Sequence, residues 1–152
     1  MKTFTIKKEH LDSDNYYIGK EDLANFQGNI ETEGSLGIVK FKSNLSVKGF
    51  IYFEAGCGIE AGCGIKAGCG IEAGWGISCK FSLNASLRIF AGLCIWKTPT
   101  DDEMIIECGK LESGEVCYGN LIEKGLPEIK KTLSGKKVTV TIEDETYTAT
   151  ID

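Results

Sequence analysis

The stretch Ile59-Glu-Ala-Gly-Cys-Gly-Ile65-Lys-Ala-Gly-Cys-Gly-Ile71-Glu-Ala-Gly-Trp-Gly, residues 59–76, spells one six-residue unit three times. An aliphatic residue opens each unit, alanine is third, and glycine is fourth and sixth. Because side chains of an extended chain alternate between two faces, the odd positions of such a unit can share one interior while the even positions face outward. The stretch predicts stacked β-strands and not a helix, where each glycine would cost about 1 kcal/mol relative to alanine.

The alternation extends well beyond these three units. Odd-numbered residues stay apolar or small over the whole range 41–95. The leading apolar residue recurs every six residues without a slip, at Phe41, Val47, Phe53, Ile59, Ile65, Ile71, Ile77, Leu83, Ile89 and Ile95. We therefore predict an all-β chain, a short β-solenoid whose odd-numbered side chains point into its core.

The unit Ile-Glu-Ala-Gly-Cys-Gly resembles the hexapeptide repeat of left-handed parallel β-helices, over the middle third of the chain. The resemblance implies three hexads per triangular coil. The stacked ladders would then be Phe41, Ile59, Ile77 and Ile95 on one wall, Val47, Ile65 and Leu83 on the second, and Phe53, Ile71 and Ile89 on the third. This stacking would also place Lys48 over Lys66 and Glu54 over Glu72, which is mildly unfavourable. A flattened solenoid with two hexads per coil is the alternative.

Three segments follow along the chain. Residues 1–40 are predicted to form an N-terminal strand, containing Phe4 and Ile6, and a cap that protects the first edge of the solenoid. Residues 41–96 form the hexad-repeat solenoid, which Pro99 and the acidic residues after it are expected to end. Residues 97–152 are predicted to form a small C-terminal β lobe, with strands at 105–111 and 115–122, a short helix or connector at 126–133 and a terminal hairpin from 138–142 and 147–151.

Composition excludes several classes of protein. The chain has 152 residues, a net charge of −5 and a single arginine, so the electrostatic attraction that nucleic-acid binding requires is missing. No apolar run is long enough for a signal core or a membrane span, and we expect a cytoplasmic protein without membrane contact. The seven cysteines are odd in number and four of them fall on the inward side of the repeat. We expect reduced core thiols and no metal, although Cys57, Cys63 and Cys69 could together form a buried thiolate site.

Catalysis is not expected. The best-known activity of the hexapeptide family is acyl transfer, and its enzymes rely on a general-base histidine placed on a coil at a subunit interface. The only histidine of this chain, His10, lies outside the repeat. We therefore predict a non-enzymatic protein without catalytic residues or cofactors, and keep an acyltransferase-like protein as a remote alternative.

The candidate binding residues are large side chains at the outward, even-numbered positions: Phe50, Tyr52, Arg88, Phe90 and Trp96. Aromatic and arginine side chains together are typical of contact hot spots between proteins. Two interpretations are open for them. Either the N-terminal segment or the C-terminal lobe covers them, or another molecule does.

The repeat, continuing into Ser-Leu-Arg88-Ile-Phe-Ala-Gly-Leu-Cys-Ile-Trp96, is also similar to a set of small uncharacterised proteins of bacterial and phage genomes. That resemblance implies an accessory protein of a mobile element, and we expect a protein-binding module that inhibits a host defence protein. The alternative is a self-assembling β-solenoid scaffold. Distinct capping segments favour a monomer or closed homodimer over open polymerisation.

Overall fold

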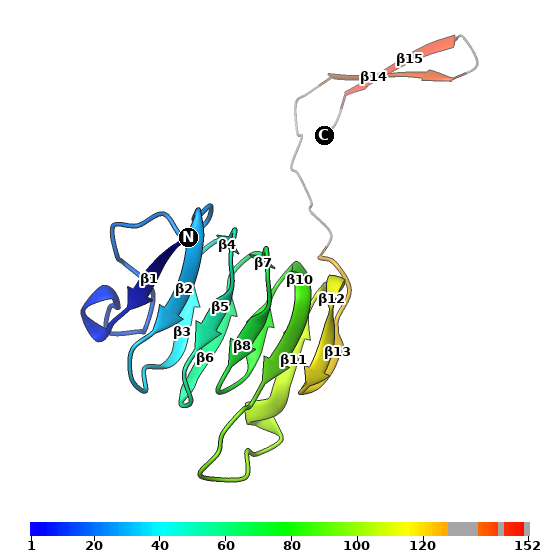
Figure 1. The fold of residues 1–152 in the computed structure, drawn as a ribbon. Helices are drawn as coiled ribbons and strands as arrows, with labels where there is room; N and C mark the ends of the chain where they lie inside the picture. Colours follow the sequence, from blue (N-terminus) through cyan, green and yellow to red (C-terminus); the bar gives the residue numbers. More distant parts are fainter. Residues whose placement is uncertain (128–136, 143–144, 151–152) are drawn as a thin grey trace.

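The computed structural model describes residues 1–127, 137–142 and 145–150, and it is all-β, with parallel strands in curled sheets as in a β-solenoid (Figure 1). The strands are β1 (Lys2–Ile6), β2 (Gly28–Thr32), β3 (Gly37–Phe41), β4 (Leu45–Val47), β5 (Ile51–Phe53), β6 (Cys57–Ala61), β7 (Ile65–Ala67), β8 (Ile71–Ala73), β9 (Ile77–Cys79), β10 (Ser82–Ala91), β11 (Ile105–Cys108), β12 (Lys110–Tyr118), β13 (Asn120–Glu123), β14 (Lys137–Ile142) and β15 (Glu145–Thr150). Two 3-10 turns, η1 (Lys8–His10) and η2 (Asp102–Met104), complete the described elements.

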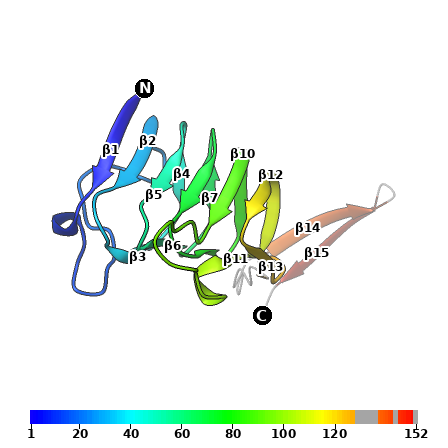
Figure 2. The ribbon, with the colours of Figure 1, turned by 60° about the horizontal axis from the view of Figure 1, so that its bottom comes forward.

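Three walls of parallel strands surround the core (Figure 2). Wall A contains β4, β7 and the first part of β10, and wall B contains β1, β2, β5, β8 and the last part of β10. Wall C contains β3, β6, β9, β11 and β13. β10 and β12 bend at a corner and run through both wall A and wall B, which joins these two walls into one sheet.

The predicted pairing of residues eighteen apart is found in the middle of the repeat. Ile59 pairs with Ile77, and the partners eighteen residues apart on the other walls are Ile65 with Leu83 and Ile71 with Ile89. All of these side chains are at most 1% exposed. A flattened coil would pair residues twelve apart, so that alternative is wrong.

The first coil is two residues longer than predicted. Ile71 pairs with Ile51 and not with Phe53, and the same offset gives the pairs Ile59 with Val39 and Ile65 with Leu45. The two extra residues lie in the segment 54–58, which contains the turn after β5 and the first two residues of β6. In this segment Gly56 has a φ of +84° and the Cys57 amide donates to the Glu54 carbonyl. Two extra residues leave the odd–even alternation intact, which is why the repeat looks unbroken in the sequence.

This offset also changes which outward charges meet. The predicted like-charge contacts are wrong: the actual pairs are Lys66 with Ser46, not Lys48, and Glu72 with Tyr52, not Glu54. On wall C, Glu60 lies beside Lys40. The longer first coil therefore replaces two repulsive neighbours with neutral ones, and it keeps a pair of opposite charges on wall C, where the predicted stacking would have placed Lys42 beside Glu60.

The glycines of the repeat sit where successive coils come closest. A Cβ atom on Gly68 would overlap the Lys48 carbonyl oxygen of the preceding coil, and one on Gly70 would lie 2.9 Å from the Arg88 carbonyl oxygen of the following coil. The fourth-position glycines Gly62 and Gly74 meet the preceding backbone in the same way. Close approach of neighbouring coils thus explains both glycines of the hexad.

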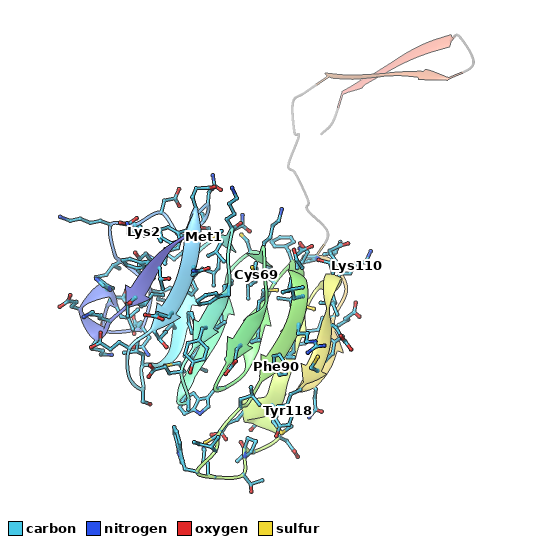
Figure 3. The ribbon with its side chains drawn as sticks, viewed as in Figure 1. Met1, Lys2, Cys69, Phe90, Lys110 and Tyr118 are labelled. Atoms are coloured by element: carbon cyan, nitrogen blue, oxygen red, sulfur yellow. The ribbon has the colours of Figure 1, made fainter. Side chains whose placement is uncertain are left out.

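From Ile59 onward, the fifth position of the hexad does not face the core as predicted, whereas the earlier fifth-position residues Leu45, Ile51 and Cys57 are buried. Strands β7, β8 and β9 are only three residues long, so the fourth to sixth residues form the corners between walls. Cys63, Cys69 and Trp75 are half-buried at these corners, and Leu87 is 61% exposed. Figure 3 shows Cys69 at one of them.

The N-terminal segment closes the first end of the coil, as predicted. Phe26 bridges to Val47 and Tyr16 bridges to Lys40, so the outer edges of β4 and β3 are covered. Large residues fill the interior at this end: the rings of Tyr17 and Phe41 lie 5.9 Å apart. The buried apolar side chains of the cap are Ile6, Leu11, Leu23, Phe26, Ile30 and Leu36.

The boundary predicted at residue 96 is wrong, because the walls continue through β13. Ile106, and not Ile95, stacks on Ile77. The chain leaves the coil at Gly92, which has a φ of +82°, and returns at Met104, whose side chain lies against Gly92. Ile95 is fully exposed on the intervening loop. Residues 105–123 therefore form further rungs of the walls and not a separate lobe.

The predicted terminal hairpin is confirmed in its pairing. β14 and β15 form an antiparallel two-stranded sheet in which Val140 pairs with Tyr147. Most of the helix or connector predicted at 126–133 lies outside the described residues.

The buried Ile51–Ile71–Ile89 ladder predicts that truncating its middle residue strongly destabilises the fold. Ile71→Ala should lower the free energy of unfolding by about 2–5 kcal/mol, because it opens a cavity in the middle of a fully buried ladder. Chemical denaturation measures this loss. The control Ile18→Ala changes an isoleucine that is 58% exposed and should stay within about 0.5 kcal/mol of the parent; equal effects would contradict the ladder.

Candidate functional site

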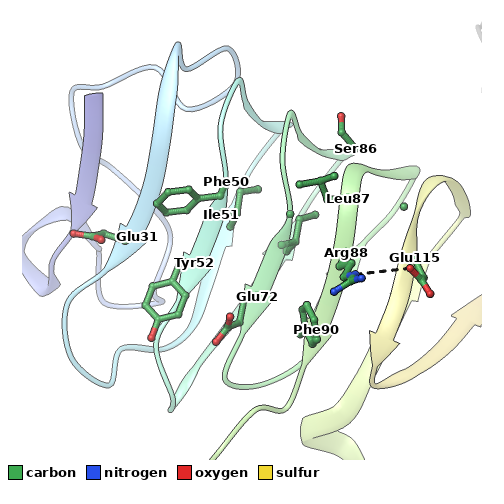
Figure 4. A pocket seen from close by; sticks show the side chains of 13 residues that line it. Glu31, Phe50, Ile51, Tyr52, Glu72, Ser86, Leu87, Arg88, Phe90 and Glu115 are labelled. Atoms are coloured by element: carbon green, nitrogen blue, oxygen red, sulfur yellow. Dashed lines mark ion pairs between the residues drawn. The ribbon is translucent and has the colours of Figure 1, made fainter. Parts of the chain in front are cut away.

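The candidate site is an open groove on the outer face of wall B, with a volume of about 920 Å³ (Figure 4). It crosses β2, β5, β8, β10 and β12. Its side chains are the aromatic Phe50, Tyr52 and Phe90, the charged Glu31, Glu72, Arg88 and Glu115, and Ser86 and Leu87 at one end. Four of the five predicted binding residues thus line one groove.

The groove is hollow because of a glycine. Gly70 lies on its floor, on the coil between the one that carries Phe50 and the one that carries Arg88. Phe50 and Arg88 each stand one position before the Ile51–Ile71–Ile89 ladder, as Gly70 does. The missing side chain leaves a notch between a phenyl ring and a guanidinium group.

A second outward row crosses the same face. Strand pairing aligns Glu31 with Tyr52, Tyr52 with Glu72, and Glu72 with Phe90, so that acidic and aromatic side chains alternate over these four residues. Tyr118 follows Phe90 as a second aromatic residue. Phe90 and Tyr118 are seen on adjacent strands in Figure 3. Neighbouring side chains on one face of a sheet lie within contact reach of each other.

The groove has a negative electrostatic character. Arg88 Nε lies 3.9 Å from Glu115 Oε2, and the Thr5 hydroxyl donates to Glu31 at 2.8 Å. Within residues 1–127, neither Glu31 nor Glu72 forms an ion pair. Partial burial and the carboxylates of Glu72, Glu54 and Glu31 raise the pKa of Tyr52, so its phenol stays uncharged at neutral pH.

The exposure of Phe50 and Tyr52 shows whether residues 1–127 cover the predicted binding residues. Phe50 is 38% exposed and Tyr52 is 37% exposed, so residues 1–127 do not cover them. The N-terminal segment lies over the end of the coil instead. Trp96 is 68% exposed but lies on the loop between β10 and β11, outside the groove lining.

Sequence reasoning missed the acidic members of the groove. Glu31 and Glu115 lie outside the perfect repeats, and only the strand register brings them to wall B. Glu72 is inside the repeat but looks like any other outward hexad residue. Pairing Tyr52 with Glu72 requires the two-residue offset in the segment 54–58, which the odd–even alternation does not reveal.

The cysteines divide by position. Cys57, Cys79 and Cys108 are buried, as the inward alternation predicts for the first two, whereas Cys63 and Cys69 are half-buried corner residues and do not face the core. The Cys57 thiol donates to the Gly34 carbonyl at 3.0 Å and accepts from the Leu36 amide at 3.2 Å. Burial raises the pKa of Cys79 to about 12, which keeps that thiol protonated. Among the described residues, no three His, Cys, Asp or Glu side chains are grouped as metal ligands would be.

His10 belongs to the N-terminal cap. Its ring lies 5.3 Å from that of Phe4, and its Nδ1 accepts a hydrogen bond from the Lys7 amide at 3.0 Å. It is half-buried and is absent from the lining of the wall B groove. His10 therefore packs within the cap and takes no part in the groove.

No protein-family model, curated protein or solved structure matches this chain. In the part of the chain that the structure describes, no helix is long and apolar enough to cross a lipid bilayer.

Thiol alkylation tests these environments. In the folded, reduced protein Cys117, which is exposed, should react with iodoacetamide at pH 8, while Cys57, Cys79 and Cys108 should not, because they are buried and the raised pKa of Cys79 and Cys108 suppresses the reactive thiolate. Peptide mass spectrometry reads out each site. The denatured protein provides the control, in which all seven cysteines should be modified; rapid native labelling of Cys79 would contradict the buried position.

Proposed function

We propose that this chain is a non-enzymatic protein-binding module whose contact surface is the wall B groove. The observation that carries the proposal is the gathering of Phe50, Tyr52, Phe90 and Arg88 around one notch, on a face that residues 1–127 leave open. Aromatic residues and arginine are enriched among the residues that dominate binding energy at interfaces. A groove with a few convergent polar groups is also the usual form of a binding site.

The rigidity of the face supports binding as well. Phe50 adjoins β5, Tyr52 lies on β5 and Phe90 on β10, and both strands are paired on each side with other strands. Side chains held on a paired sheet lose little backbone freedom when a partner binds, so less of the interaction energy is spent on ordering.

The type of solenoid, the cellular location and the class of partner are inferred from the sequence. We propose a hexapeptide-type solenoid in a cytoplasmic protein of a mobile element, with a host defence protein as the partner and inhibition as the outcome. The spacing of eighteen residues between Ile59 and Ile77 supports the hexapeptide type. Reduced thiols without disulfides suit a cytoplasmic location.

A self-assembling scaffold is the second candidate, and the two ends of the coil weigh against it. The bridges Phe26–Val47 and Tyr16–Lys40 cover the strand edges at the N-terminal end. At the other end, β12 pairs irregularly with β10, with register shifts on both of its halves, and carries charged Lys110, Glu112 and Glu115. Irregular and charged edge strands oppose stacking of further chains. A monomer or closed homodimer fits these ends better.

Acyl transfer, the remote alternative, would require a general base beside a substrate groove. His10 lies in the cap against Phe4 and outside the wall B groove. The geometry therefore offers no support for that alternative.

The first test is capture of a partner with paired groove variants. Purified protein is immobilised under reducing conditions, a stoichiometric host protein is identified by mass spectrometry, and its affinity is measured with the two purified proteins. Phe50→Ala/Phe90→Ala should weaken that affinity at least tenfold, because alanine substitution of a hot-spot aromatic costs about 2 kcal/mol or more. Ile18→Ala, which removes an exposed apolar side chain from the cap, should leave it unchanged.

The outcome separates the two candidate functions. If the affinity of the captured partner is the same for the groove variant and for Ile18→Ala, the wall B groove is not the contact surface. Light scattering over a range of concentrations completes the test, because a particle that grows with concentration would favour the scaffold.

Trp96 is tested separately. Since its side chain is exposed on the loop after Gly92, Trp96→Ala should leave the melting temperature within about 1 °C of the parent. If Trp96 extends the contact surface, the same variant should weaken partner binding. A loss of several degrees with unchanged binding would show that Trp96 has a structural role only.

A further inference from the structure

We infer that the wall B groove binds an extended basic segment of a partner protein, with lysine or arginine side chains placed against Tyr52 and Phe90 and facing Glu31 and Glu72. This inference rests on the proposed function and specifies its ligand. Extended segments commonly dock on aromatic-lined grooves, where regularly spaced side chains supply specificity.

Charge complementarity selects a cationic occupant. The groove is lined by three carboxylates, of Glu31, Glu72 and Glu115, and by one cation, Arg88, which already lies near Glu115. Two carboxylates thus remain without a cationic partner among the described residues. An anionic segment or a nucleic-acid backbone would be repelled by them, whereas a lysine or arginine would be attracted.

The aromatic rings support the same occupant. Tyr52 stands between Glu31 and Glu72 in the strand register, and Phe90 follows Glu72. Ammonium and guanidinium groups are attracted to the faces of such rings, most strongly where water is partly excluded. Acidic and aromatic groups that alternate along one row therefore offer a cation both kinds of interaction at once.

The register also sets the spacing of the basic residues. Glu31 and Glu72 are aligned with Tyr52 between them, so they lie two strand spacings, about 9.6 Å, apart. A polyproline-II segment rises about 9.3 Å over three residues and returns to the same face. Basic residues at positions i and i+3 of such a segment would match the two carboxylates. The notch over Gly70 would admit the backbone of the segment beside them.

The experiment uses the whole protein and the synthetic peptide acetyl-Pro-Lys-Pro-Pro-Lys-Pro-amide, titrated to millimolar concentration and followed by NMR. The expected result is saturable shift changes at Gly70, Tyr52 and Phe90. Affinity should fall when glutamate replaces both lysines, and also when the lysines are spaced i and i+2. No shift change on wall B, or equal changes with the glutamate peptide, would overturn the inference.

Matched charge variants extend the test. Glu31→Gln/Glu72→Gln should weaken peptide binding about fivefold or more, since two exposed charge contacts are lost. Glu60→Gln/Glu107→Gln removes the same charge from wall C and should have no effect. Both variants keep the side-chain volume, and their melting temperatures report whether the fold is retained. Equal weakening by the two variants would show a long-range charge effect and overturn the inference.

The partner of the first test keeps the two proposals distinct. If its binding is lost in Phe50→Ala/Phe90→Ala but survives in Glu31→Gln/Glu72→Gln, the groove is the contact surface and its ligand is not basic. If neither variant affects it, the proposed function itself fails.

Discussion

The structure depends on how closely successive coils approach at their corners. Parallel strands of neighbouring coils are held at one hydrogen-bonded spacing, about 4.8 Å, along every wall. At the corners this spacing brings backbone against backbone, and the Gly68 and Gly70 positions leave no room for a Cβ atom between coils. Once the corners accept that approach, the isoleucine of each hexad meets the isoleucine of the next coil, as Ile59 meets Ile77, and the core is a set of continuous aliphatic ladders. The glycines thus make the stacking sterically feasible, and the ladders make it stable.

Much of this could be predicted because it is local. The alternation places Ile65, Ile71 and Ile77 inside, and the hexad length indicates which residues lie eighteen apart. The longer first coil could not be predicted, because the two extra residues at 54–58 preserve the alternation. The end of the solenoid was also misplaced: the hexads stop near Gly92, but the hydrogen-bonding edge of β9 remains free to pair with any later strand of suitable shape, and β11 takes that position after a loop. The repeat therefore indicates the stacking reliably within the perfect hexads, and less reliably at either end of the walls.

The candidate site could be predicted only in part, for its aromatic and arginine residues but not for its acidic ones. The even-numbered, outward positions of Phe50, Tyr52, Arg88 and Phe90 are enough to mark them as large side chains outside the core, and all four line one groove. The odd–even alternation does not indicate which residues of neighbouring strands lie side by side. Glu31 reaches Tyr52 from a strand of the cap, and Glu115 reaches Arg88 from beyond the loop, through pairings that no hexad encodes. The charge of the groove depends on these neighbours, which are distant in sequence, so it can be described only once the strand register is known.

The same glycine notch recurs on wall A, and the comparison indicates what makes wall B distinct. Gly64 lies between Asn44 and Ser82 much as Gly70 lies between Phe50 and Arg88, with a Cβ position 3.0 Å from the Ser82 carbonyl oxygen. The notch on wall A is flanked by small polar groups, and the Asn44 side chain spans it by accepting a hydrogen bond from the Gly64 amide. On wall B the flanking residues are a phenyl ring and a guanidinium group, which leave the notch open. The backbone that stacking requires thus provides a notch in both walls, and the less regular coils on either side of the perfect repeats determine which notch can receive a ligand. Selection for binding would act on those flanking positions, because Gly70 itself cannot change without disturbing the coil.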